Sequence, residues 1–213
     1  MILEEYDFHL KHPFTMVISG PTGCGKTQWL RKLLEMREIM CDHNPKKITY
    51  FYGQWQTCFS DLKNLTFKHG IENATLDDFD SSEPQWIIVD DLMNEATSSK
   101  FISDLFTKGS HHKNLSVILL LQNFFGRGKE ARNITLNAQY IILFKNPRDK
   151  LIATNIARQM YPNSVKKFLL IFEEATREPF SYLFIDLKPE TSERKRLITN
   201  VLGEEKFATV YFI

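Results

Sequence analysis

Short apolar runs alternate with segments of helical periodicity along most of this chain. Residues 26–40 and 95–108 place apolar side chains at helical spacing, with a glycine at 109 to end the second segment. Compact apolar runs with the length of buried strands occur at residues 14–19, 47–52, 86–89, 116–121 and 140–144. Strands that alternate with helices are typical of βα units around a mostly parallel sheet. The pattern therefore predicts an α/β fold with a central sheet flanked by helices.

The remaining stretches are less regular. Residues 54–84 suggest a short helix near 58–62 and a short strand near 65–68. Further along, the pattern predicts a short helix late in 123–137, helices at 147–161 and 162–175, and a last strand at 182–186. From residue 188 a charged run is followed by an apolar end. No boundary is evident, so residues 1–213 are expected to form a single domain.

A glycine-rich loop follows the first predicted strand and opens the first predicted helix. It fits the pattern G-x-x-x-x-G-K-[ST] and consists of Gly20, Pro21, Thr22, Gly23, Cys24, Gly25, Lys26 and Thr27. In such a loop the backbone N–H groups form an anion nest, and the helix N-terminus adds partial positive charge. Lys26 can reach the β- and γ-phosphates, and the Thr27 hydroxyl can ligate Mg²⁺. The strand–loop–helix order favours an ATP-binding P-loop over a glycine-rich turn without a ligand.

The second half of such a site is a buried strand that ends in a carboxylate. The run at residues 86–89 is followed by Asp90 and Asp91. Asp90 is expected to hold the Mg²⁺ ion, the Walker B role. Asp91 is suited to be the general base that polarises the attacking water. The alternative for Asp91 is a helix N-cap.

The strand at 116–121 ends at Gln122. In ATPases with an additional strand between the P-loop strand and the Walker B strand, that strand ends in a polar residue near the γ-phosphate. A glutamine amide can donate to phosphate and orient water. Gln122 is therefore predicted to be a sensor of the γ-phosphate.

Hydrolysis also calls for an arginine, because negative charge develops on the γ-phosphoryl oxygens in the transition state. The candidates are Arg127, Arg132 and Arg148. Arg148 follows the strand at 140–144, at the strand end where ligand sites of α/β proteins gather. Spacing does not rank the three, and each has the alternative of being a surface residue.

Composition adds the class of protein and one asymmetry. Hydrophobic residues make up 43% and charged residues 25%, as in an ordinary globular protein. Three cysteines without CxxC spacing argue against a disulfide framework and a zinc site and fit a reducing compartment. No run has the ~20 apolar residues that a transmembrane helix needs, and the acidic first residues do not resemble a signal peptide. We therefore expect an intracellular protein that does not act at a membrane.

The net charge of +1 conceals a basic middle. Residues 100–150 carry 9 lysines and arginines against 3 acidic residues, whereas residues 1–99 carry 9 against 15. A basic patch facing a polyanion is one reading, and solvated helix faces are the other.

With these motifs in view, the chain resembles the FtsK/HerA-type ATPases, and more narrowly the poxvirus-type genome-packaging ATPases of large DNA viruses, adintoviruses and Polinton-type elements. The resemblance is carried by HPFTMVISGPTGCGKT (12–27), WIIVDDLM (86–93) and the stretch from HHKNLSVILLLQN to LNAQYIILFKNPRD (111–149). It covers about residues 8–160, leaving 161–213 as C-terminal helices, a last strand and a tail. One departure is that many related motors have glutamate where this chain has Asp91.

The resemblance implies a RecA/FtsK-like fold and an ATP-hydrolysing motor that assembles as a homo-oligomeric ring and drives double-stranded DNA into a capsid without reading its sequence. It implies the roles given above for Lys26, Thr27, Asp90, Asp91 and Gln122, and an arginine acting across a subunit interface. A capsid or portal protein is a candidate partner. The place of action would be a host nucleus or a cytoplasmic viral factory, with the virion as a further option.

Two alternatives remain open. One is another P-loop enzyme, either a helicase-like motor or a nucleoside or nucleotide kinase, although a kinase has little use for Asp91 because it must avoid activating water. The other is a nucleotide-dependent assembly protein with little turnover. The segment 123–129, with Phe124, Phe125 and two cations, is either a loop that touches the DNA backbone or a pair of aromatic anchors in the core.

Overall fold

The computed structural model describes residues 2–5, 8–90, 92, 99–110, 113–126, 129–202 and 207–213, with the backbone alone at 2–5, 58 and 207. The strands of this part are β1 (Ile2–Glu5), β2 (Thr15–Ser19), β3 (Lys47–Tyr52), β4 (Thr66–His69), β5 (Gln85–Asp90), β6 (Leu115–Leu121), β7 (Tyr140–Phe144), β8 (Tyr182–Asp186), β9 (Leu197–Thr199) and β10 (Phe207–Tyr211). They form one sheet in the order β1-β10-β9-β8-β7-β2-β6-β5-β3-β4. The segment from β7 to β4 is parallel, and β8, β9, β10 and β1 extend it in antiparallel fashion.

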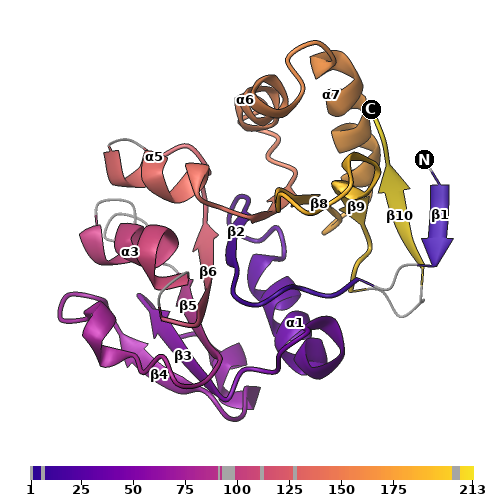
Figure 1. Cartoon of the computed structure of the whole chain (residues 1–213). Helices are drawn as coiled ribbons and strands as arrows, with labels where there is room; N and C mark the ends of the chain where they lie inside the picture. Colours follow the sequence, from indigo (N-terminus) through magenta and orange to yellow (C-terminus); the bar gives the residue numbers. More distant parts are fainter. Residues whose placement is uncertain are drawn as a thin grey trace.

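Helices cover both faces of this sheet (Figure 1). They are α1 (Lys26–Met40), α3 (Lys100–Asp104), the π-helical turn η3 (Leu105–Gly109), α5 (Lys129–Leu136), α6 (Leu151–Met160) and α7 (Val165–Ala175), with short 3₁₀ turns at η1 (Thr57–Asp61), η2 (Leu76–Asp78) and η4 (Glu193–Lys195). α1 packs on one face, and α3, η3, α5, α6 and α7 pack on the other. The predicted mostly parallel α/β fold is confirmed.

Alternation along the central strands explains these two layers. In β5, Trp86 and Ile88 contribute to the core under α1, whereas Ile87 and Val89 contribute to the core under the other helices. Because both faces are covered, these strands are apolar at consecutive positions, as expected for a parallel sheet. This is why the sequence shows them as continuous apolar runs.

Several predicted boundaries agree with the structure, and α1, β3, β7 and β8 agree to the residue. The helix predicted from residue 147 is wrong at its start, because α6 begins at Leu151. The side chains of Asn146 and Asp149 accept the backbone N–H groups of Arg148 and Leu151, at 3.1 and 2.9 Å. These side-chain turns replace the expected first helical turn.

The helix predicted at 95–108 is described only from Ser99, whose side chain accepts the N–H of Ile102 and caps α3; residues 93–98 lie outside the described part. The helix predicted from residue 162 begins at Val165. The strands β1, β9 and β10 were not predicted. β1 and β9 have only four and three residues, and β10 lies in the apolar end of the tail, where no clear alternation marks a strand.

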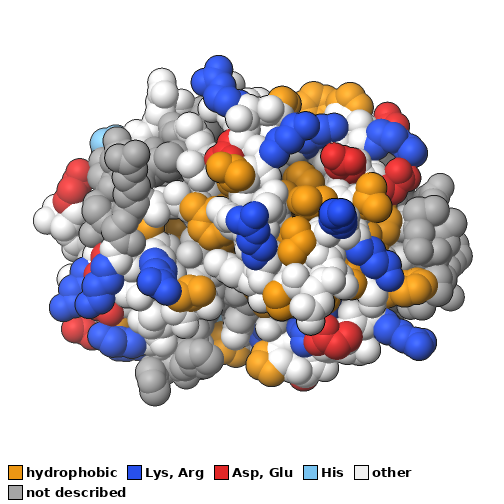
Figure 2. All heavy atoms as spheres, turned by 90° about the horizontal axis from the view of Figure 1, so that it is seen from above, with side chains coloured by type: hydrophobic (Ala, Val, Ile, Leu, Met, Phe, Trp, Pro, Cys, Tyr) orange, Lys and Arg blue, Asp and Glu red, His pale blue; other side chains and the backbone are white. Residues whose placement is uncertain are grey.

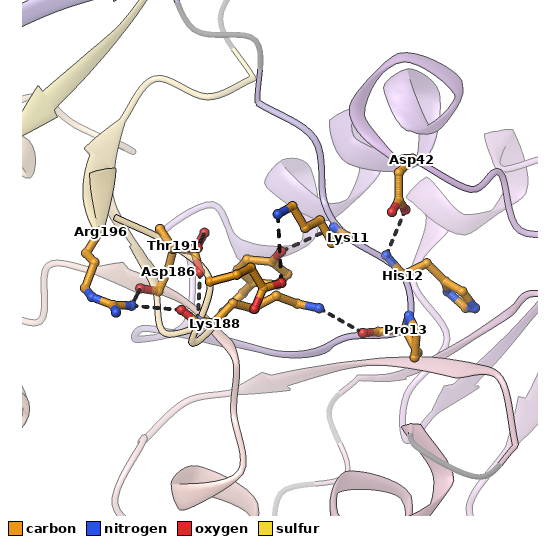
Figure 3. Close-up of polar contacts among 10 residues, drawn as sticks. Lys11, His12, Pro13, Asp42, Asp186, Lys188, Thr191 and Arg196 are labelled. Carbon is orange, nitrogen blue, oxygen red and sulfur yellow. Dashed lines mark hydrogen bonds and ion pairs between the residues drawn. The ribbon is translucent and has the colours of Figure 1, made fainter. Parts of the chain in front are cut away.

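Polar contacts behind β8 join the antiparallel extension to the parallel core (Figure 3). The Lys188 ammonium, whose residue is 7% exposed, donates to the Pro13 carbonyl at 3.1 Å, just before β2. The Asp186 carboxylate accepts from the Lys188 N–H and the Thr191 hydroxyl, both at 2.9 Å. Burial lowers the pKa of Lys188 and raises the pKa of Asp186. These contacts fix the extension against the start of the P-loop strand.

The central strand β6 allows a direct stability test. Leu119 in β6 is 1% exposed, and Leu170 on α7 is 66% exposed. Leu119→Ala is expected to reduce the free energy of unfolding by about 2–5 kcal/mol, because it removes buried methyl groups and leaves a cavity. Leu170→Ala, the matched control, is expected to change it by less than about 0.5 kcal/mol. Urea denaturation followed by circular dichroism measures both, and equal losses would contradict the assigned burial.

Candidate nucleotide-binding site

The loop after β2 has the backbone that phosphate binding requires. Gly20 donates its N–H to the Leu121 carbonyl at 3.1 Å, so the loop starts in register with β6. Gly23 and Gly25 have φ values of 79° and 105°, in the left-handed region that favours glycine. A Cβ at Gly20 would lie 2.6 Å from Cys24 Sγ and 2.7 Å from Phe144 Cβ. Glycine is therefore required at all three positions, for conformation at two and for space at the third.

Lys26 closes this loop from the first turn of α1. Its ammonium donates to the carbonyls of Gly20 and Pro21, at 2.6 and 3.0 Å. The first bond of the helix runs from the Trp29 N–H to the Gly25 carbonyl at 2.8 Å. A lysine charge, a helix N-terminus and left-handed glycines thus meet at one point, as in an anion-binding nest.

A cleft of about 910 Å³ opens beside the loop. Its lining includes Thr22, Gly23, Gly25, Lys26 and Thr27 from the loop, together with Asp90 and Gln122. The structure therefore brings together the predicted phosphate-binding residues, the predicted Walker B residue Asp90 and Gln122. Their roles in chemistry stay predictions.

Asp90 is held at the end of β5. It is 5% exposed, and its carboxylate accepts a hydrogen bond from the Tyr50 hydroxyl at 2.8 Å. Its carbonyl accepts the Gly53 N–H at 3.1 Å. Both partners come from β3 or the turn after it, so β3 orients this carboxylate. Asp91 lies outside the described residues.

Gln122 follows β6, which pairs with β2 on one side and β5 on the other. The additional strand between the P-loop strand and the Walker B strand is thus present. Gln122 also lines a second hollow of about 480 Å³ with Pro21, Thr22 and Arg148. Gln122 thus borders the loop in both hollows, with Asp90 in the first and with Arg148 in the second.

The three arginine candidates fall in different places. Arg148 is exposed and lines the hollow that it shares with Gln122 and the loop. Arg132 is exposed on α5 and lines none of the clefts found around the loop in the described part of the chain. Arg127 lies outside the described residues. Of the two candidates that the structure describes, Arg148 is thus the one that shares a hollow with the loop.

The chain after α7 completes the cleft, which the sequence did not reveal. Phe180, Tyr182, Asn200 and Leu202 line the cleft opposite Asp90. Phe180 and Asn200 have φ values of 64° and 62°. Asparagine adopts this left-handed conformation more readily than most residues, whereas phenylalanine does not. Arg177 lies near the loop in a smaller hollow, where Glu174 and Glu178 pair with it at 3.1 and 3.5 Å.

The residues are suited to a magnesium ion held in the manner of P-loop enzymes. Mg²⁺ retains several waters and takes one or two protein oxygens together with phosphate oxygens. Thr27 and the buried Asp90 carboxylate supply such oxygens beside the loop. In the described part of the chain, no cluster of three or more histidine, cysteine or acidic residues offers a separate metal cage.

The lysine and arginine side chains on the face shown in Figure 2 do not form one continuous patch. Lysine and arginine side chains are interspersed there with apolar and acidic ones. In the segment 123–129, Phe124 is 2% exposed and packs edge-on against Phe125 at 5.0 Å between ring centroids. Phe124 is thus a core anchor, while residues 127 and 128 lie outside the described part.

Fold and site together define a P-loop NTPase fold of the additional-strand type. No family model matches the chain, and no curated protein matches its sequence. Solved structures do resemble it. B204, the DNA-packaging ATPase from Sulfolobus Turreted Icosahedral Virus, superimposes with a TM-score of 0.57 at 12% identity, covering 84% of this chain and 96% of that one.

Two further structures agree with this result. The genome-packaging NTPase B204 from Sulfolobus turreted icosahedral virus 2, in complex with AMPPCP, gives a TM-score of 0.55 at 14% identity, over 84% of this chain and 95% of that chain. The cytoplasmic domain of the type VII secretion ATPase EccC from Thermomonospora curvata superimposes with a TM-score of 0.52 at 11% identity, over 92% of this chain and 25% of that one. The fold expected from the resemblance to packaging ATPases is confirmed.

The Tyr50–Asp90 hydrogen bond yields a prediction. Tyr50→Phe is expected to weaken Mg²⁺-dependent ADP binding by about 5-fold. The reason is that the hydrogen bond to the Asp90 carboxylate orients this group, and its loss costs about 1 kcal/mol or more of binding free energy. ADP binding without Mg²⁺ is expected to stay unchanged. Isothermal titration with and without Mg²⁺ measures both.

Tyr52→Phe, on the same strand, is the matched control, because the Tyr52 hydroxyl makes no hydrogen bond within the described part of the chain. An equal loss in Tyr50→Phe with and without Mg²⁺ would refute the orienting role of Tyr50.

Proposed function

We propose that this chain is an ATP-hydrolysing motor that translocates double-stranded DNA and packages it into a capsid. The observation that carries the proposal is the convergence of the P-loop, the buried Asp90 and Gln122 on one cleft. The likeness to B204, described as a DNA-packaging ATPase, supports the choice of DNA as the partner. In the described residues no helix is long and apolar enough to cross a bilayer.

The proposed chemistry is attack of water on the γ-phosphorus. The new bond forms between the water oxygen and phosphorus, the bond from phosphorus to the β–γ bridging oxygen breaks, and ADP leaves with that electron pair. Asp91 takes the proton of the attacking water, and Gln122 orients that water and reads the γ-phosphate. Thr27 and Asp90 would hold Mg²⁺, which would neutralise charge on the phosphates when bound.

Lys26 and the loop N–H groups stabilise the charge that moves onto the β–γ bridging oxygen. Arg148, beside Gln122, is proposed to face the γ-phosphate of its own subunit. Arg132, away from the loop on α5, is proposed to act on the site of a neighbouring subunit in a homo-oligomeric ring. A capsid or portal protein would then hold the ring, in a nucleus or cytoplasmic factory.

The central prediction concerns DNA and the base. Steady-state ATP hydrolysis is expected to rise on addition of double-stranded DNA of any sequence, and this rise is expected to fade with added salt, because phosphate contacts release counterions. Asp91→Asn is expected to lower turnover by about 100-fold or more while ADP binding persists.

Asp77→Asn, whose side chain is 95% exposed, is the control and is expected to leave turnover unchanged. ATP turnover that does not change on addition of DNA would exclude the motor function and favour another P-loop enzyme. Tight nucleotide binding with negligible turnover would favour an assembly protein.

The arginine assignments separate in a mixing experiment. Arg148→Ala and Arg132→Ala are each expected to lower turnover by about 1000-fold if they act as arginine fingers. Mixing Arg132→Ala with Asp91→Asn subunits is expected to restore part of the activity, because an arginine that acts in trans can complete a neighbour's intact site. Mixing Arg148→Ala with Asp91→Asn is expected to restore none. The opposite pattern would exchange the two roles.

A further inference from the structure

Phe180 combines exposure with an unusual backbone. It lies in the loop between α7 and β8, and 71% of this large apolar residue is exposed. Its φ of 64° lies in the left-handed region, which is disfavoured for residues with a bulky side chain. Within the described part of the chain, its ring has no recorded contact with another aromatic ring. Residues whose backbone is held in a sparsely populated conformation cluster at active sites and ligand-binding sites.

The ring of Phe180 stands directly beside the P-loop. A Cβ placed on Gly25 would lie 3.5 Å from Phe180 Cδ1 and 3.6 Å from Phe180 Cβ. Phe180 also lines the main cleft. A molecule held by the loop therefore passes within reach of this ring.

The sheet order determines which end of a nucleotide comes to Phe180. Asp90 ends β5 and Gln122 follows β6, and both strands lie on one side of β2, so the terminal phosphates face that side. Phe180 precedes β8, and β8 lies on the other side of β2, beyond β7. An extended nucleotide with its phosphates on the loop thus directs its base towards Phe180.

We propose that Phe180 is the stacking platform for the nucleobase and that Asn200 contacts the polar edge of the base, an inference that rests on the proposed function. Asn200 is exposed, follows β9 and lines the same end of the cleft. Its amide supplies two donors and an acceptor. A stacking ring favours the larger π-surface of a purine, so the platform selects purine over pyrimidine nucleotides.

Other aromatic residues of the cleft are less suited to this role. Trp55 follows β3, beyond Asp90 in the sheet order, and its ring packs against Tyr52 and Phe67, both at 5.3 Å between centroids. Tyr182 is 8% exposed and packs against Trp29 at 5.7 Å. Phe180 is the exposed ring on the base side of the loop.

The test separates the base from the phosphates by comparing ADP with inorganic pyrophosphate, which has two linked phosphates and no base. Phe180→Gly removes the ring and is compatible with the left-handed backbone, so thermal stability is expected to be kept or raised. Titration calorimetry of this variant is expected to show about 10-fold weaker ADP binding and unchanged pyrophosphate binding. Phe180→Trp is expected to retain tight ADP binding.

A second test measures the selectivity of the site for the base of the nucleotide. The native chain is expected to bind ADP more tightly than CDP, and Phe180→Gly is expected to bring the two affinities closer together. Asn200→Ala is expected to weaken ADP but not pyrophosphate. Leu170→Ala, another exposed apolar residue that lies outside the clefts around the loop, is the control and is expected to change neither.

The outcomes distinguish this inference from the proposed function. Equal losses of ADP and pyrophosphate in Phe180→Gly, or no loss of ADP, would overturn the platform. If Phe180→Gly weakens ADP binding alone while the native chain shows no DNA-stimulated turnover, the role of Phe180 in base stacking is supported and the proposed motor function is refuted. Native binding of neither ligand would overturn both.

Discussion

β2 pairs in parallel with β6 on one side and β7 on the other, and this placement fixes where each part of the nucleotide cleft lies. The pairing of β2 with β6 continues into the loop, since the Gly20 N–H donates a hydrogen bond to the carbonyl of Leu121, the last residue of β6. The carboxyl ends of β2, β6 and β5 therefore lie at one edge, which brings Gln122 and Asp90 to the loop without any sequence proximity. A shift of β2 by one residue would exchange its two buried faces and displace the loop.

The antiparallel extension contributes the opposite wall of the same cleft. Tyr182 begins β8, and Asn200 follows β9, so residues late in the chain face residues from its first quarter. The contact of Lys188 with the Pro13 carbonyl ties this wall to the start of β2 (Figure 3). The phosphate end of the cleft thus belongs to the parallel core, and the end with Phe180 belongs to the extension.

Local chemistry explains which features the sequence predicted. The loop was predictable because Gly23, Gly25 and Lys26 are required by local conformation and charge, and the central strands because burial on both faces makes them continuously apolar. The hydrogen bond from Tyr50 to Asp90 was not predictable, because it depends on strand order. Phe180 was missed because a left-handed φ at a phenylalanine leaves no pattern in the sequence. The start of α6 was wrong because Asn146 and Asp149 compete for backbone N–H groups.

The ladder between β8 and β9 has only two residue pairs in the described part of the chain, fewer than any other ladder of the sheet there. Arg196 reinforces it, since its guanidinium donates to the Asp186 and Lys188 carbonyls at 3.1 and 3.0 Å and its carbonyl accepts the Asp186 N–H at 2.9 Å. The position of Asn200, which follows β9 and lines the cleft, therefore depends on Arg196 as well as on this short ladder.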